Sequence, residues 1–353
     1  MVLKQSALDN NVAVMARYAA EHHFDLAPHA KTTMAPDILR RQLEAGAWGI
    51  TVANVQQART AYDAGADRVV IANEVVGRAD AAAMTDLVAA GDRAIYCLVD
   101  SVAGVELLEA NLRAAGARRA VGALVELGTP HGRAGARTVG EAVQVAKAVS
   151  ACRHLSLAGA EGYEGGLGSD RSYTTLAAVD AYLGTLRELT LTLANAGAFA
   201  STEPIVSAGG SKYFDRVAAV LGPGAGFKGL DVRLVVRSGC YVVHDHGLYE
   251  EASPLSASRA TPGLVAALEA WAEVLSVPEP GLAIVGLGKR DVSFDFGLPT
   301  PLRIARARHD AAGELGHWAV TKLDDQHGYL KPRDDGAPLL AVGDRVEIGR
   351  AHV

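Results

Sequence analysis

The sequence predicts an α/β protein that combines a TIM (β/α)8 barrel with a C-terminal antiparallel β domain. Over about 240 residues, eight short apolar runs alternate with alanine-rich segments whose apolar residues recur at helical spacing. Brief, continuous apolar runs are typical of parallel strands that are buried on both faces. After about Tyr241 the pattern changes to strand-like runs separated by turn residues, which indicates a second, mostly antiparallel part.

Strands and helices are expected to alternate along the first part of the chain. The expected helices have an apolar face and end at or next to a glycine, as in 36–46, 55–65 and 102–115. An open, doubly wound sheet fits the same alternation and is the alternative to the barrel. The expected strands are 25–30, 49–53, 68–72, 94–99, 121–126, 155–159, 205–207 and 233–236.

The C-terminal part contains shorter strand signals bounded by turn residues. One helix is expected at 263–274. The spacing of apolar residues changes near residue 245, and no flexible linker marks the boundary. We therefore place the barrel in residues 1–245 and the β domain in residues 246–353. The expected strands of this domain are 281–286, 292–296, 317–321 and 344–348.

Composition narrows the class of protein. The 353 residues include 34 Lys and Arg against 40 Asp and Glu, a net charge of −6, which argues against binding to nucleic acid or to an anionic membrane. The three cysteines lie far apart, which suits a reducing compartment better than a disulfide framework. No apolar stretch approaches the roughly 18 residues of a membrane helix. We therefore expect a cytoplasmic enzyme with a small-molecule substrate.

A lysine follows the first expected strand, where barrel enzymes place their active sites. Lys31 stands in the run Ala27-Pro28-His29-Ala30-Lys31. At the end of that strand its side chain would point into the mouth of the barrel, where burial would lower its pKa and suit it to imine chemistry. A lone lysine would more commonly be a surface residue.

The segment APHAKTTMAP resembles the cofactor-lysine motif of fold-type III pyridoxal-phosphate enzymes, which include alanine racemase, D-threonine aldolase and eukaryote-type D-serine dehydratase. The resemblance implies a barrel of the alanine racemase type and pyridoxal 5′-phosphate as cofactor. It makes Lys31 the Schiff-base lysine. His29, two residues earlier, would brace the cofactor or the lysine. The nearest relatives have glycine where Ala30 stands.

Further segments resemble the family in the same order along the chain. Arg133, in ELGTPHGRAG, matches the arginine that contacts the phenolic oxygen of the cofactor, and Tyr163 matches a tyrosine near it. The glycine-rich turn after strand seven would offer backbone N–H groups to the phosphate. The residues implied at the phosphate, after strands seven and eight, are Ser207, Gly209, Gly210, Ser211, Gly239 and Tyr241.

The C-terminal segments 322–328 and 342–348 resemble the domain that carries a metal in the D-threonine aldolase and D-serine dehydratase branch. There a His-x-Cys or His-x-Asp pair binds a divalent cation such as Zn, Mn, Mg or Co. His352 matches the histidine, and the second ligand is expected one residue beyond Val353. The run His244-Asp245-His246 also has ligand residue types, with hydrogen bonding within a loop as the alternative.

The combined motifs VSAGGS, RSGCYVVHDHGLY and LDDQHG look most like bacterial cryptic D-serine dehydratases or amino-acid deaminases. The resemblance implies a pyridoxal-phosphate- and metal-dependent lyase of β-hydroxy D-amino acids, with D-serine dehydration to a 2-keto acid and ammonia as first choice. D-threonine aldolase, which forms glycine and an aldehyde, is the alternative. An amino-acid racemase and a non-catalytic cofactor-binding protein are further alternatives. The resemblance also implies a homodimer.

Overall fold

The computed structural model describes residues 1–89, 92–224, 226–227, 229–306 and 312–350. The chain divides into two compact units, one of Met15–Gly239 and one of Met1–Val14 with Cys240–Val353. These units differ from the expected ranges 1–245 and 246–353 at residues 1–14 and 240–245, which belong to the second unit.

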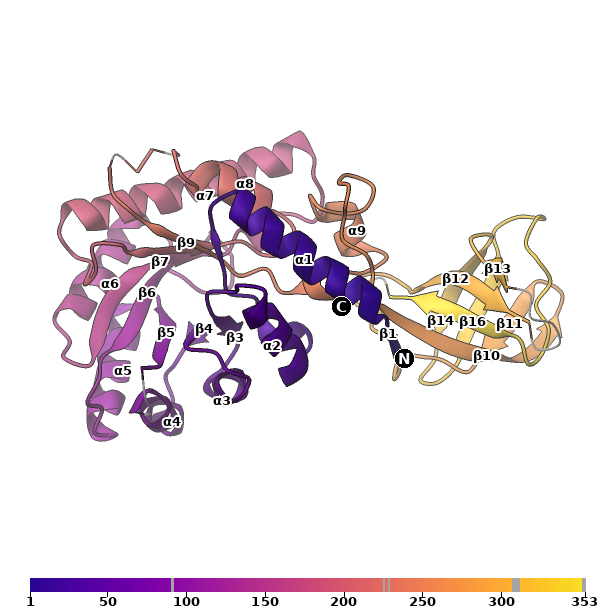
Figure 1. Cartoon of the computed structure of the whole chain (residues 1–353), viewed down its shortest axis with the longest axis horizontal. Helices are drawn as coiled ribbons and strands as arrows, with labels where there is room; N and C mark the ends of the chain where they lie inside the picture. The colour runs from indigo at the N-terminus through magenta and orange to yellow at the C-terminus, as the bar shows by residue number, and fades with distance from the viewer. Residues whose placement is uncertain (90–91, 225, 228, 307–311, 351–353) are drawn as a thin grey trace. The chain divides into compact units, whose positions relative to one another are not determined.

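The first unit is a parallel barrel (Figure 1). Its eight strands pair in the order β2-β9-β8-β7-β6-β5-β4-β3, and a parallel bridge between His29 and Thr51 joins the two ends of this order. The order runs round the sheet without the reversal that a doubly wound fold requires. The predicted barrel is therefore confirmed. The strands are β2 Asp25–Leu26, β3 Ile50–Val52, β4 Arg68–Glu74, β5 Ala94–Val99, β6 Val121–Leu127, β7 Leu155–Gly162, β8 Ile205–Ala208 and β9 Arg233–Val236.

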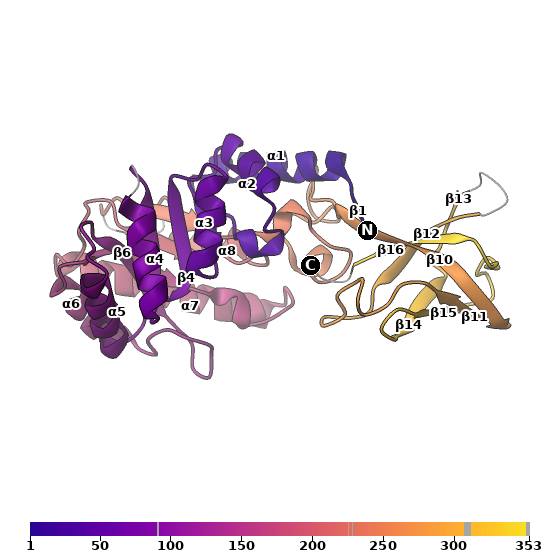
Figure 2. The ribbon, with the colours of Figure 1, turned by 90° about the horizontal axis from the view of Figure 1, so that it is seen from below.

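Helices cover the outside of the strands, and those from α3 to α7 contact one another in chain order (Figure 2). Local signals set their starts: Asn54, Ser101 and Ser172 each accept a backbone N–H with the side chain, and Thr138 forms a capping box with Glu141. The helices of this unit are α2 Pro36–Glu44, α3 Val55–Asp63, α4 Arg78–Ala89, α5 Val102–Ala114, α6 Val139–Ser150, α7 Tyr173–Asn195 and α8 Phe214–Leu221, and helix α1 Gln5–Glu21 has residues in both units.

Branched side chains from the strands, together with Ala27, fill the interior of the barrel, and each branched side chain contributes about 1.5–3 kcal/mol on burial. This packed interior leaves only the rims of the barrel for polar chemistry. The cluster consists of Ala27, Val70, Leu98, Leu124, Ile205 and Val235.

The second unit is an antiparallel sheet, as predicted, in the order β13-β12-β16-β10-β11-β15-β14, with β1 paired to β10. Its own core contains Val285, Trp318 and Ile348 among other buried side chains. The short helix α9 Leu248–Ala252 precedes the sheet. The strands are β1 Val2–Leu3, β10 Leu268–Glu279, β11 Leu282–Val285, β12 Thr300–Ala305, β13 Ala312–Glu314, β14 Trp318–Leu323, β15 Gly328–Pro332 and β16 Arg345–Gly349.

Two of the secondary-structure predictions for this unit are wrong. The helix expected at 263–274 is instead largely strand β10, because Ala272 and Val274 are buried while Trp271 and Leu275 are 37% and 47% exposed, an alternation with the period of a strand. The strand expected at 292–296 is a turn region.

The first residues of the chain belong to the second unit through hydrogen bonds and charge. Strand β1 pairs antiparallel with Leu268 and Glu269 of β10, and Lys4 forms an ion pair with Glu269. The fully buried amide of Asn11 donates to the carbonyl of Val265 at 2.7 Å and accepts from the Val265 N–H at 2.8 Å. Among the described helices, none has the length and apolar character that crossing a membrane requires.

Candidate active site

Lys31 lies just past the carboxyl end of the first barrel strand, on the 3-10 turn η1 Ala30–Thr32. His29 begins this turn, and its Nδ1 accepts the backbone N–H of Lys31 at 3.4 Å. The side chain of Lys31 is exposed, so the expectation of a buried lysine is wrong. The reason is that β2 ends at Leu26, and residues 30–32 turn away from the strand instead of continuing it.

His29 is the partly buried centre of a basic group. Its pKa is lowered to about 3, first by burial and then by the positive charges of Lys31, Arg237 and Arg133. The imidazole is therefore neutral near pH 7, which agrees with its role as acceptor of the Lys31 N–H. Three cations from different strand ends thus gather around one neutral histidine, an arrangement suited to an anionic, oxygen-rich ligand.

Arg133 and Tyr163, two residues that the motifs indicated for the cofactor, lie beside each other. The Arg133 guanidinium carbon lies 5.6 Å from the centre of the Tyr163 ring, and Tyr163 is 42% exposed. Arg137, which sequence reasoning missed, shapes the loop that carries Arg133. Its guanidinium donates to the carbonyls of Ala134 at 2.6 Å and Gly132 at 2.9 Å, so the loop is folded around it.

A buried ion pair close to His29 was also missed by the sequence analysis. Arg237, directly after β9, is 6% exposed and pairs with Glu161 of β7, which is 1% exposed. Arg237 also donates to the Ser207 hydroxyl at 3.1 Å and to the carbonyl of Gly162 at 3.1 Å. The ion pair therefore ties the ends of β7, β8 and β9 together. A charged residue directly after an apolar strand was the available signal.

A second carboxyl accompanies the pair. Glu126 of β6 is 3% exposed, and its pKa is raised to about 9 by burial, by the charge of Glu161 and by Glu74. Burial raises the pKa of Glu161 as well, but Arg237 opposes that rise. The raised pKa keeps Glu126 protonated near pH 7, and the direct contact with Arg237 favours the ionised form of Glu161.

The glycine-rich turn after β8 holds several of the predicted phosphate residues. Gly209 has a φ of 95°, a conformation that favours glycine. Ser207 is fully buried, and its hydroxyl donates to the carbonyl of Val235 at 2.9 Å. Ser211 is half-buried at the end of the turn. The structure places these residues together at the carboxyl ends of β8 and β9, which is the rim where Lys31 lies.

Two predicted residues stand close to the unit boundary. Gly239 lies against the backbone of His29, where a Cβ atom would clash, so its lack of a side chain is needed for packing. Tyr241, in the turn η3 Cys240–Val242 of the second unit, is 3% exposed.

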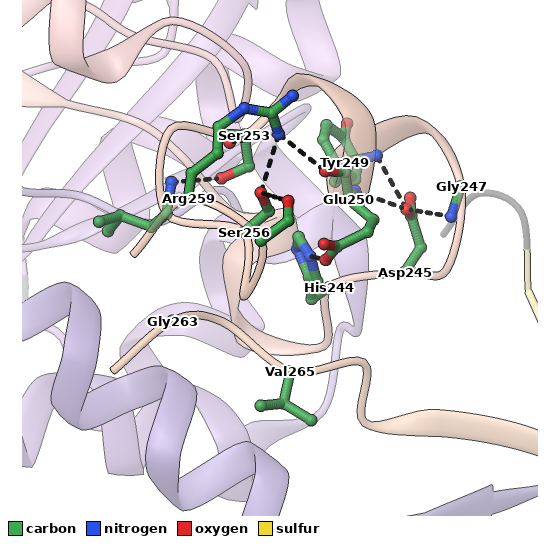
Figure 3. Close-up of polar contacts among 12 residues, drawn as sticks. His244, Asp245, Gly247, Tyr249, Glu250, Ser253, Ser256, Arg259, Gly263 and Val265 are labelled. Atoms are coloured by element: carbon green, nitrogen blue, oxygen red, sulfur yellow. Dashed lines mark hydrogen bonds and ion pairs between the residues drawn. The ribbon is translucent and has the colours of Figure 1, made fainter. Parts of the chain in front are cut away.

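The run His244-Asp245-His246 forms hydrogen bonds within its loop (Figure 3). His244 Nε2 lies 3.0 Å from a carboxylate oxygen of Glu250, and Asp245 accepts the N–H groups of Gly247 at 3.0 Å and Tyr249 at 2.8 Å. No three His, Cys, Asp or Glu side chains in the described part of the chain are arranged to hold a metal ion. His352, the predicted metal ligand, lies outside the described residues.

The first unit offers what pyridoxal phosphate requires. Lys31 supplies an exposed amine, and Arg133 and Arg237 supply positive charge around neutral His29. The N–H groups of Gly209 and Gly210 both donate to the carboxylate of Glu164, so the phosphate would take other donors at the same rim. The residues present therefore fit the cofactor that the resemblance implies.

Comparisons with known proteins point in one direction. The family model described as the alanine racemase N-terminal domain matches residues 3–216, and that described as a putative serine dehydratase domain matches residues 267–353. The chain is 25% identical to a D-threonine aldolase of an Arthrobacter species and 26% identical to the 3-hydroxy-D-aspartate aldolase of Paracoccus denitrificans. Each match covers 100% of this chain and 84% of the relative.

Solved structures show the same similarity. The D-threonine aldolase from Filomicrobium marinum superposes with a TM-score of 0.81 at 27% identity, over 99% of this chain and 86% of that one. A variant of D-threo-3-hydroxyaspartate dehydratase, solved in a metal-free form, has the same fold at 22% identity and a TM-score of 0.72, over 99% of this chain and 89% of that one.

Proposed function

The chain belongs to the fold-type III pyridoxal-phosphate enzymes, and we propose that within this family it dehydrates D-serine to a 2-keto acid and ammonia. It is a pyridoxal-phosphate-dependent lyase, as are its relatives. The names of those relatives support β-hydroxy D-amino acids as the substrate class. The match of residues 267–353 to a serine dehydratase domain supports dehydration.

The observation that carries the proposal is the position of Lys31. It lies at the carboxyl rim of the barrel, beside neutral His29 and within the field of Arg133 and Arg237. Pyridoxal phosphate, when bound, withdraws electrons from the Cα of an amino acid. Lys31 Nζ would accept the Cα proton. His29 orients Lys31 by accepting its backbone N–H.

For cofactor binding we propose the residues that the motifs indicated. Arg133 would bind the phenolic oxygen, with Tyr163 beside it, and the turns after β8 and β9 would bind the phosphate. The residues that the motifs indicated at the phosphate are Ser207, Gly209, Gly210, Ser211, Gly239 and Tyr241. Gly209 and Gly210 would contribute the shape of the turn, because their N–H groups donate to Glu164.

We further propose a divalent metal at His352, where it would polarise the β-hydroxyl of the substrate. Support comes from the resemblance of segments 322–328 and 342–348 and from the metal-free form described for a related dehydratase. A chelator should suppress turnover, and an added divalent cation should restore it. Full activity in chelator would reject the metal.

D-threonine cleavage is the second candidate, because two of the similar proteins are named D-threonine aldolases. Product analysis with D-threonine, pyridoxal phosphate and a divalent metal separates the two reactions. Dehydration yields 2-ketobutyrate and ammonia, whereas cleavage yields glycine and acetaldehyde. Glycine and acetaldehyde as the products would replace the dehydratase proposal by the aldolase. D-threonine and D-serine both returned unchanged would overturn both.

The role of Lys31 has its own test. The Lys31→Ala variant should lose the visible absorbance of the bound cofactor after free cofactor is removed, because the variant lacks the amine that forms the covalent link. Lys147→Ala, at an exposed lysine of α6, is the matched control and should keep the absorbance. Retention of the band in the Lys31 variant would contradict the assignment.

Two further expectations stay predictions. The resemblance implies a homodimer, which the molar mass in solution would test. A cytoplasmic location is expected from the composition.

A further inference from the structure

A buried glutamate occupies the backbone donors of the glycine-rich turn. Glu164, on the 3-10 turn η2 Glu164–Gly166 after β7, has no exposed surface. One of its carboxylate oxygens accepts the N–H of Gly209 at 2.9 Å, and the other accepts the N–H of Gly210 at 2.7 Å. Hydrogen bonds from N–H groups to a carboxylate are about twice as strong as neutral ones.

The same turn is held from its opposite side. The buried Ser238 hydroxyl donates to the carbonyl of Gly210 at 2.8 Å, and the backbone N–H of Arg237 lies 3.2 Å from the carbonyl of Gly209. Both peptide groups of the turn are therefore fixed before any ligand arrives. Lys212 lies two residues after Gly210. Burial lowers the pKa of its ammonium group, and the charge of Glu164 opposes that change.

We propose that Glu164 is a positioning residue for the cofactor phosphate. This inference rests on the proposed function, because it takes pyridoxal phosphate as the ligand. Glu164 acts through the turn: it fixes the peptide groups of Gly209 and Gly210 and keeps their two N–H groups for itself. The phosphate contacts fall on other donors of the rim, which the fixed turn aligns.

A competing hypothesis predicts the opposite change in cofactor affinity when Glu164 loses its charge. If the phosphate had to displace the carboxylate from the two N–H groups, Glu164 would oppose binding, since two anions cannot share the same donors. Removing the charge would then strengthen cofactor binding. In the positioning account the turn loosens without the carboxylate, and binding weakens.

The experiment compares two ligands on the apo protein, without substrate. Titration with pyridoxal phosphate and with pyridoxal, which lacks the phosphate, is followed by absorbance of the Lys31 adduct. In Glu164→Gln, one side-chain oxygen becomes an NH₂ group facing an N–H donor. We expect pyridoxal phosphate to bind roughly tenfold more weakly, the equivalent of about 1.4 kcal/mol, and pyridoxal to bind within about twofold of the unmodified protein.

A matched control and a second variant keep the test decisive. Glu106→Gln, at an exposed glutamate of α5, should change neither affinity. Ser238→Ala releases the turn from its other side and should reproduce the selective loss, even if Glu164→Gln does not fold. Tighter binding of pyridoxal phosphate, no change, or an equal loss for both ligands would overturn the proposal. An unmodified protein that forms no adduct with either ligand would instead remove the proposed function.

Discussion

Replacing Glu126 with glutamine should raise the thermal stability of the protein at pH 7. Glu126 is 3% exposed, and burial with Glu161 and Glu74 raises its pKa to about 9. The folded protein keeps this carboxyl protonated at pH 7, whereas the unfolded chain, with an ordinary pKa of about 4.3, releases the proton. Glutamine is neutral in both states and has nearly the same shape, so the variant avoids the cost of taking up that proton.

Proton linkage sets the magnitude. About 2.7 pH units at about 1.4 kcal/mol each give an upper limit of about 4 kcal/mol at pH 7. At about 2–4 °C per kcal/mol for a unit of this size, Tm rises by at most about 8–16 °C. Because the folded pKa lies above the unfolded one, the folded state binds the extra proton between about pH 4.3 and about pH 9, and the stability of the unmodified protein falls as pH rises through that range.

The assay is thermal unfolding at several pH values from about 5 to about 9. The advantage of Glu126→Gln should be smallest at the acid end and should grow toward the alkaline end. Glu106→Gln, at an exposed position, is the control and should follow the unmodified protein throughout. A variant that is less stable over the whole range, or a gain that does not change with pH, would refute the reasoning that the carboxyl is held protonated.

Three other substitutions test the packing of charge and polar groups. Glu161→Gln leaves Arg237 buried without its carboxylate, so we expect a loss of about 3–5 kcal/mol in thermal unfolding at pH 7, and an unchanged Tm would contradict the ion pair. Asn11→Ala removes a buried amide that donates to two carbonyls, and should cost about 2–4 kcal/mol; a loss below about 0.5 kcal/mol would contradict this. Arg137→Ala should speed tryptic cleavage after Arg133, because the loop loses the guanidinium it folds around, and equal cleavage rates would count against that role.

The barrel could be predicted from the sequence because its signal is local. Each buried parallel strand needs a continuous apolar run, and each outer helix needs one apolar face. Both patterns involve residues that are close in the sequence, so the alternation of strands and helices can be predicted from it. The C-terminal unit was harder to predict. Its strand β10 (Leu268–Glu279) begins with leucine, glutamate and alanine, which favour helices, and the burial of every second residue from Ala270 to Val274 outweighed that preference.

The site residues also differ in whether their signals are local or depend on distant contacts. Lys31 was predictable from a short motif at a strand end, but its exposure was not, since it depends on where β2 stops. Glu164, next to the predicted Tyr163, could not be assigned a role from the sequence, because its partners at Gly209 and Gly210 lie 45 and 46 residues away. Contacts over such separations leave no periodic trace in the sequence.

The strand–helix alternation of the barrel, the antiparallel second unit and the lysine at the rim could be predicted from the amino-acid sequence, since they depend on neighbouring residues. The pairing of the buried charges could not, because it depends on the folded arrangement of the strands. Glu126, Glu161 and Arg237 come from three different strands and meet because all parallel strands end on the same rim. Arg237 pairs with Glu161 and favours its ionised form, because a buried charge is stable only beside its partner.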